Sequence, residues 1–184
     1  DGAGPSLQRL CAFAGAQHPV NWLFDVPAVP TPLAATAAPP CPPPAILAPT
    51  IGIHEINYHP LGDFDELAEY IELRNNTDAP VNLRGYSFSD GITFVFEADT
   101  VVAPEGLVVV VRDLEYARAN FSLGEESPGS FVGNFQGNLS NSGERLTLVD
   151  PTGAPVDSVH YEDGGLWPGA ADGVGHSLEK LLPD

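Results

Sequence analysis

Between residues 51 and 181 the chain is a series of short stretches in which apolar and polar residues alternate, separated by Gly, Pro and Asn. Successive side chains of a strand point to opposite faces, so a period of two predicts half-buried strands. The clearest example is residues 92–96, where three apolar side chains share one face. Further strands of this kind are predicted over residues 51–58, 68–73, 145–150, 156–161 and 177–181.

A continuous apolar run and two local turn signals predict the remaining elements. Residues 107–111 read Leu-Val-Val-Val-Val, and such a continuous apolar run predicts a strand buried on both faces. Residues 151–155, Pro-Thr-Gly-Ala-Pro, predict a hairpin-like turn, and only residues 114–120 resemble a helical turn. Seven or eight short strands with this punctuation predict an all-β sandwich.

The apolar members of these strands form the predicted core. Burial of each large side chain contributes about 1.5–3 kcal/mol. The predicted core residues are Ile53, Ile56, Ile71, Leu73, Phe88, Phe94, Phe96, Val109, Val111, Leu146, Leu148, Val159 and Trp167.

Several of these segments carry a family resemblance. Residues 53–60 read Ile-His-Glu-Ile-Asn-Tyr-His-Pro, and residues 69–75 read Glu-Tyr-Ile-Glu-Leu-Arg-Asn. Further motifs follow in order at residues 81–92, 104–111, 139–144, 156–161 and 167–179. The ordered set resembles the lamin tail domains of bacteria over residues 51–181. The resemblance implies an immunoglobulin-like β-sandwich found on secreted and surface proteins, with a binding or architectural role and no catalytic residues.

The matched motifs also have folding roles. Trp167 and Pro168 are expected to form an apolar plug beside a rigid turn. Six glycines are expected in turns that require a positive φ, a conformation that glycine adopts at no steric cost. They are Gly85, Gly91, Gly106, Gly143, Gly173 and Gly175.

Residues 1–50, here called the arm, lie outside the resemblance and contain 11 of the 19 prolines. Proline lacks an amide N–H and fixes φ, so the stretch 37–44 is predicted to be extended, near polyproline II geometry. The arm is also apolar and needs a partner surface. That surface belongs either to residues 51–184 of the same chain, here called the body, or to a neighbouring subunit. The side chains expected to make this contact are Trp22, Phe24, Val26, Val29 and Leu33.

The two cysteines, Cys11 and Cys41, both lie in the arm. An exported chain with two cysteines is a candidate for a disulfide, so a Cys11–Cys41 bridge is predicted. Two free thiols, or bonds to other chains, are the alternatives.

The charge balance narrows the possible partners. The chain carries 25 acidic and seven basic residues, which gives a net charge of −18. Phosphates would be repelled over most of such a surface, so nucleic-acid binding and association with anionic membranes are disfavoured. No apolar run of 18 residues is present, so no membrane insertion is expected. The chain starts at Asp1 and lacks methionine, which favours processing from a precursor and a secreted, extracellular or cell-surface location.

Catalytic chemistry finds little support in the sequence. The five histidines show no helical zinc spacing, and no CxxC motif is present. Ser158, His160 and Asp163 could be read as a hydrolytic triad, but neighbours on one strand alternate between faces. No cofactor is expected, apart from a possible calcium ion.

The best ion-binding candidate is the acidic loop 62–69, in which Asp63, Asp65 and Glu66 could bind calcium. It lacks the full EF-hand pattern, and a solvated acidic loop is the alternative. Glu162 and Asp163 with Asp172 form a weaker candidate.

Glycans are possible partners as well. Three sequons for N-glycans begin at residues 75, 120 and 138, and the stretch 31–50 has the composition of an O-glycan carrier.

Three hypotheses for the function follow. The first is a non-enzymatic extracellular structural subunit that polymerises with copies of itself through the arm, into a surface fibre or layer. The second is a monomeric extracellular binding or spacer module, for cations or glycans, whose arm packs on its own body. The third, an enzyme fragment, is disfavoured.

Overall fold

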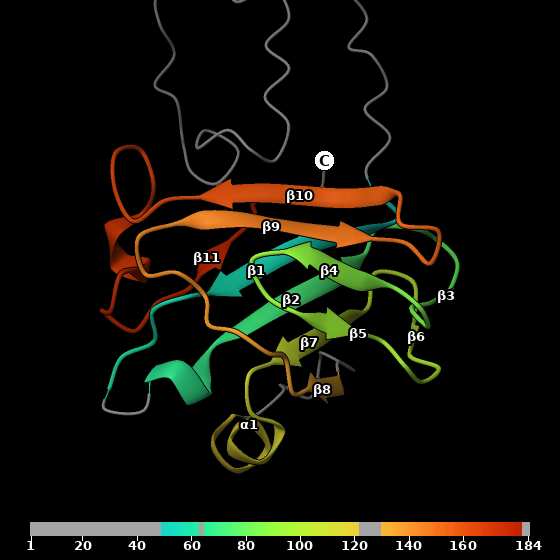
Figure 1. Ribbon diagram of the computed structural model, residues 1–184, viewed down its shortest axis with the longest axis horizontal. Coiled ribbons are helices and arrows are strands. Elements are labelled where there is room, and N and C mark those ends of the chain that lie inside the picture. The colour runs from blue at the N-terminus through green and yellow to red at the C-terminus, as the bar shows by residue number, and fades with distance from the viewer. Residues whose placement is uncertain (1–48, 63–64, 122–129, 182–184) are drawn as a thin grey trace, which may run out of the picture.

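The computed structural model describes residues 49–62, 65–121 and 130–181. These residues form eleven strands, one short α-helix and two 3-10 turns, arranged as a sandwich of two sheets (Figure 1). The predicted all-β, immunoglobulin-like sandwich is therefore confirmed. Neither the helix nor the turns have the length and apolar character needed to cross a bilayer in the described part.

The larger sheet has five strands in the order β11-β1-β2-β7-β8. Its neighbours are antiparallel except for β7 and β8, which run parallel. The strands are β1 (Ile51–Asn57), β2 (Tyr70–Asn75), β7 (Leu107–Val111), β8 (Ser130–Gly133) and β11 (Leu178–Glu179).

The smaller sheet has four antiparallel strands in the order β10-β9-β4-β5, and it lies across the larger sheet in Figure 1. Its strands are β4 (Ser87–Asp90), β5 (Phe94–Val95), β9 (Glu144–Val149) and β10 (Pro155–Tyr161). A two-stranded ribbon pairs β3 (Val81–Asn82) with β6 (Val101–Val102). The remaining elements are the 3-10 turns η2 (Asp65–Ala68) and η3 (Gly169–Ala171) and the helix α1 (Leu114–Asn120).

The main core lies between the two sheets and is built from their inward-facing side chains. All the predicted core residues are buried except Phe94, which is partly buried and packs against the core. Trp167 is only 6 % exposed, as expected for an apolar plug. The strand reading of the sequence is therefore confirmed for the core.

The strand β7 is buried on both faces, as its continuous apolar run predicts. Val108 and Val110 face the main core, whereas Val109 and Val111 contribute to a second cluster with Ala117 of α1. The helix α1 covers the outer face of the sheet here, below β7 and β8 in Figure 1. Asp113 caps it, since its Oδ1 accepts the amide of Tyr116 at 2.8 Å.

A β-bulge in β1 decides which side chains face outward. Ile53 lies opposite Leu73, and Glu55 lies opposite Glu72, so His54 is the extra residue. The extra residue shifts the alternation by one, so Ile56 faces the core as Ile53 does. Without the bulge, Glu55 would point inward and Ile56 outward.

Two groups of local predictions need correction. Gly106 does not adopt a positive φ, whereas the other five predicted glycines do. The left-handed residue of that turn is Glu105, with φ 55°, and glycine follows because a Cβ at position 106 would lie 2.9 Å from the carbonyl oxygen of Ala103. The strands predicted at 92–96 and 177–181 shorten to β5 and β11, and residue 68 ends a 3-10 turn instead of starting a strand.

Candidate functional site

An apolar groove of about 540 Å³ lies between β5 and β8. These two strands are the free edges of the two sheets on one side of the sandwich (Figure 1). Among the described residues, each of the two pairs with one strand only. The groove is lined by Thr93, Phe94, Val95, Phe96, Glu97, Ala98, Thr100, Leu114, Phe131, Val132, Gly133, Asn134 and Gln136.

Aromatic and aliphatic side chains give this groove its character. The rings of Phe94 and Phe96 pack edge to face with centroids 4.9 Å apart. Val95 is 48 % exposed, although it is a large apolar residue on a strand. Glu97 is the one charged residue of the lining, on a body whose surface is otherwise acidic. The groove is therefore suited to an extended, apolar and nearly uncharged chain.

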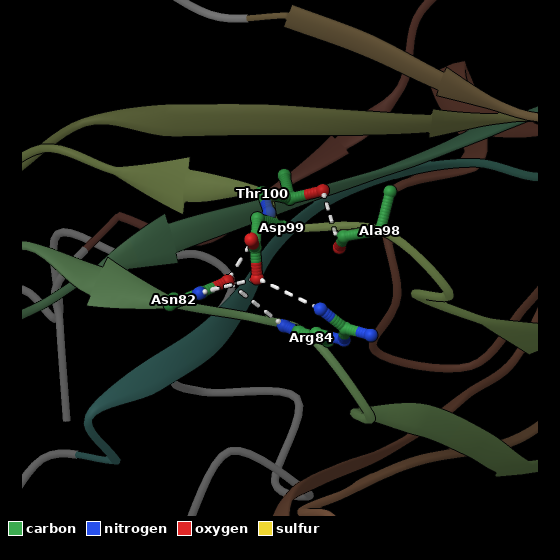
Figure 2. A network of polar contacts seen from close by, with 5 residues as sticks. All are labelled: Asn82, Arg84, Ala98, Asp99 and Thr100. Atoms are coloured by element: carbon green, nitrogen blue, oxygen red, sulfur yellow. Dashed lines mark hydrogen bonds and ion pairs between the residues drawn. The ribbon is translucent and has the colours of Figure 1, made fainter.

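Hydrogen bonds and an ion pair join the chain segments at the two ends of the groove. At one end, the backbones of Thr93 and Gln136 exchange two hydrogen bonds of 2.9 Å. At the other end lies the network of Figure 2, in which Asn82 Oδ1 accepts the amide of Thr100 and Asn82 Nδ2 donates to Asp99. Arg84 lies 3.6 Å from the same carboxylate. The hydrogen bond from Asn82, together with Arg84, holds the pKa of Asp99 below its usual range.

A second hollow continues the groove along α1. It shares Leu114 and Asn134 with the groove and is completed by Glu115, Arg118 and Ala119. Leu114 and Arg118 are one helical turn apart and thus lie on the same face of α1. Among the described residues no acidic group forms an ion pair with Arg118.

The outer face of the larger sheet carries a row of three carboxylates. Glu179 of β11, Glu55 of β1 and Glu72 of β2 occupy directly opposed positions on adjacent strands. Glu55 accepts hydrogen bonds from the hydroxyls of Tyr70, at 2.6 Å, and Ser177. Burial, together with the charges of Glu55 and Glu179, raises the pKa of Glu72 to about 7. Glu72 can therefore hold a proton near neutral pH.

The predicted calcium loop is only partly placed. Asp63 lies outside the described residues, Asp65 begins the turn η2, and Glu66 is exposed on that turn. Within residues 49–62, 65–121 and 130–181 no three His, Cys, Asp or Glu side chains converge to hold a metal ion. Calcium binding by the loop stays a prediction.

Ser158, His160 and Asp163, which could be read from the sequence as a hydrolytic triad, do not form one in the structure. The hydroxyl of Ser158 lies 3.1 Å from that of Thr147 on β9, while His160 and Asp163 are exposed. A different histidine has an acidic partner: His59 Nδ1 lies 2.6 Å from Asp172 Oδ1. That pair joins residue 59 to the loop after η3, where a short bridge also forms, so it has a structural role.

Asn75, the asparagine of the first sequon, has a structural role in the fold and is not placed to accept a glycan. Asn75 is fully buried, and its Nδ2 donates to the carbonyls of Ala79, Val102 and Ala103 at 2.8–3.0 Å. Its Oδ1 accepts the amide and the hydroxyl of Thr77. No local pattern around Asn75 predicts this role. Asn120 and Asn138 of the other sequons are exposed.

The predictions made for the arm lie outside the described residues and stay predictions. The predicted disulfide joins Cys11 and Cys41. The predicted contact residues are Trp22, Phe24, Val26, Val29 and Leu33.

Sequence reasoning missed the groove. Two signals were present: an apolar outward residue, Val95, in an alternating strand, and a short Ser-Phe-Val-Gly stretch at 130–133. Neither reveals that the two edges lie side by side, because their pairing is non-local.

The comparison with known families fits this geometry. The profile of the lamin tail domain matches residues 45–163, which is more than half of the 184-residue chain. No curated protein sequence matches the chain at a significant level. The matched family has an immunoglobulin-like, non-enzymatic fold. The chain belongs to the lamin tail domain family.

Proposed function

We propose that this chain is a non-enzymatic structural subunit of an extracellular assembly, in which the arm joins each body to the next. The observation that carries the proposal is the apolar groove between two free sheet edges, on a chain that also has an apolar arm. Exposed edges of this kind invite an added strand from another molecule. A contact of arm to body is head-to-tail, and such contacts produce open filaments unless the rotation closes a ring.

Electrostatics favours a connector of this composition. The body carries 23 acidic and six basic residues, so two bodies repel each other when they approach. The arm has only three charged residues, Asp1, Arg9 and Asp25. A nearly neutral arm can link two acidic bodies without adding to that repulsion, and salt weakens the repulsion between the bodies themselves.

The arm also needs burial of its side chains in order to become ordered. Fixing a residue costs about 1–2 kcal/mol of backbone entropy, less for proline, which starts out restricted. Trp22, Phe24, Val26 and Val29 can offset that cost only against an apolar surface. The groove is such a surface.

Deletion of residues 1–45 tests the proposal. The core residues run from Ile51 to Leu178, so the truncated body is expected to keep its fold, which far-ultraviolet circular dichroism checks. We expect the intact chain to form filaments or a concentration-dependent series of oligomers in sedimentation and electron microscopy. We expect the truncated chain to remain monomeric. If the truncated chain assembles to the same extent as the intact one, the arm does not connect the subunits and the proposal is wrong.

A monomeric extracellular binding or spacer module is the second candidate, because the arm can also reach its own groove. The arm leaves the body at Pro49, beside β1, and β8 lies three strands away in the same sheet. At about 4.8 Å per strand this is only about 14 Å. A mass in solution that stays at one chain over a wide concentration range would favour this candidate.

A further inference from the structure

We propose that the groove between β5 and β8 is the receptor for residues 22–33 of the arm of a second copy of this chain. The inference rests on the proposed function and names the surface through which it would operate. It also predicts which residues of the groove and of the arm meet.

The shape of the groove matches an extended segment. It runs from the Ala98–Thr100 wall to the Thr93–Gln136 bridge and continues past Leu114 along α1. Its walls are the free edges of two strands, and an added segment can hydrogen-bond to either edge. Prolines at 27, 30 and 32 leave the residues between them free to donate toward one side, which suits an edge position.

The chemistry of the two surfaces is complementary. Trp22 and Phe24 are large apolar side chains, and the groove offers Phe94, Val95 and Phe131 as contact surface. Aromatic anchors seated in desolvated pockets contribute most of the affinity in many protein interfaces. The groove's lining carries one charge and residues 22–33 carry one, so few charged groups are stripped of water.

The single charge of the segment also has a partner within reach. Asp25 follows Phe24 directly, and Arg118 lies one helical turn beyond Leu114, where the groove continues. We orient the segment so that the residues after Phe24 run toward α1. We therefore place Asp25 against Arg118 in the complex.

The length of the arm permits exchange between subunits. Leu33 and Pro49, where the described body begins, are sixteen positions apart in the sequence. At about 3.1 Å per residue in polyproline II geometry, this separation spans about 50 Å. A bound segment can therefore belong to a body some distance away.

The first test compares two full-length variants, Val95→Asp and Val101→Asp. Both valines are exposed on short strands, at 48 % and 65 %, but only Val95 lines the groove. We expect Val95→Asp to raise the concentration needed for assembly by at least about tenfold, the effect of losing one buried apolar contact. Val101→Asp should assemble as the unmodified chain does, and both variants should keep the same urea midpoint within error.

The second test distinguishes exchange between chains from packing within one chain. A full-length Trp22→Ser/Phe24→Ser variant keeps the groove but has a defective arm, and Val95→Asp keeps the arm but has a defective groove. Mixing them should give a discrete 1:1 dimer by light scattering, since one chain donates and the other accepts. If neither the mixture nor the unmodified chain associates, the proposed exchange is wrong.

The third test is a charge exchange. Asp25→Arg and Arg118→Asp should each weaken assembly, and the double variant should restore it. Arg145→Asp, an exposed residue of β9 outside the groove, is the matched control and should have no effect. Failure of the double variant to recover places Asp25 elsewhere and overturns the register proposed here.

The outcomes separate this inference from the proposed function. If the arm variant fails to assemble while Val95→Asp assembles normally, the arm is the connector but the groove is not its receptor. If the arm variant assembles as the unmodified chain does, the proposed function itself falls, and the receptor with it.

Discussion

The carboxylate row on the outer face of the larger sheet makes the stability of this fold depend on pH near neutrality. Glu72 lies directly opposite Glu55, which in turn lies opposite Glu179. Burial and these two like charges raise the pKa of Glu72 from 4.5 to about 7, against a smaller opposing effect of Arg74. In the unfolded chain the same carboxyl would titrate near its ordinary value.

The sign of the effect follows from which state binds the proton more tightly. The folded state does, so protonation of Glu72 stabilises the fold. This stabilisation is fully present below about pH 4.5 and is lost as the pH rises through about 7. Each unit of pKa difference corresponds to about 1.36 kcal/mol, which sets an upper limit of about 3.4 kcal/mol. Because Glu72 is partly exposed, solvent screening reduces the expected effect to about 1–2 kcal/mol.

Glu72→Gln isolates this contribution, since glutamine keeps the shape and cannot ionise. At pH 8 we expect the variant to be about 1–2 kcal/mol more stable than the unmodified chain, and at pH 4, below the ordinary pKa of the carboxyl, the two should be nearly equal. Urea unfolding of both proteins at pH 4, 5, 6, 7 and 8, with a chelator present, measures the difference. Glu162→Gln, at an exposed loop position, is the control and should show no such trend.

The difference between the two proteins is the quantity to use, because other groups also titrate in this range. Burial lowers the pKa of His54, and this favours the fold as the pH rises, opposite in sign to Glu72. That contribution is common to both proteins and cancels in the comparison to first order. A stability difference that does not vary between pH 5 and pH 8 would refute the reasoning, and so would a variant less stable than the unmodified chain at pH 8.

Three further predictions concern other parts of the chain. Asn75→Ala should destabilise the body by about 2–4 kcal/mol, because it removes a buried side chain whose amide donates to three carbonyls, one of them buried, and urea unfolding measures this. Calcium should raise the melting temperature if the acidic loop 62–69 binds it, since a ligand of the folded state alone stabilises that state; an unchanged melting curve at millimolar calcium would count against the site. Cys11 and Cys41 should resist thiol-specific labelling in the unreduced protein and react after reduction, as intact mass reports; two labels without reduction would exclude the bridge.

Much of the body could be predicted because its core follows from local alternation. The inward residues of β2 and β9 repeat every second position, and the apolar run of β7 requires cover on both sides. The hairpin between β9 and β10 was readable too, since Asp150 accepts backbone amides of the turn and Gly153 adopts φ 84°. In each case the chemistry that forms the element lies within a few residues of it.

The parts that could not be predicted depend on residues distant in the sequence. The strand β8 is four residues long and pairs in parallel with β7 across the intervening helix, so nothing local marks it as a strand. Asn75 has the context of a glycan sequon, and only the fold places three carbonyls around its amide. The carboxylate row combines three strands, one of them near the end of the described body.

The bulge in β1 shows how one residue couples these features. Apolar residues at 51, 53, 56 and 58 change their phase between Ile53 and Ile56, which is itself a readable sign of an inserted residue. The bulge keeps Ile56 in the core while it turns Glu55 outward beside Glu72. It coincides with the inter-sheet bond in which the amide of Ile53 donates to Asp157 of β10 at 2.8 Å. The outer face near β1 is therefore acidic, which is unfavourable for contact with another acidic body. The groove between β5 and β8 has Glu97 as the one charged residue of its lining, so it is the surface on which a neighbour can bind with less repulsion.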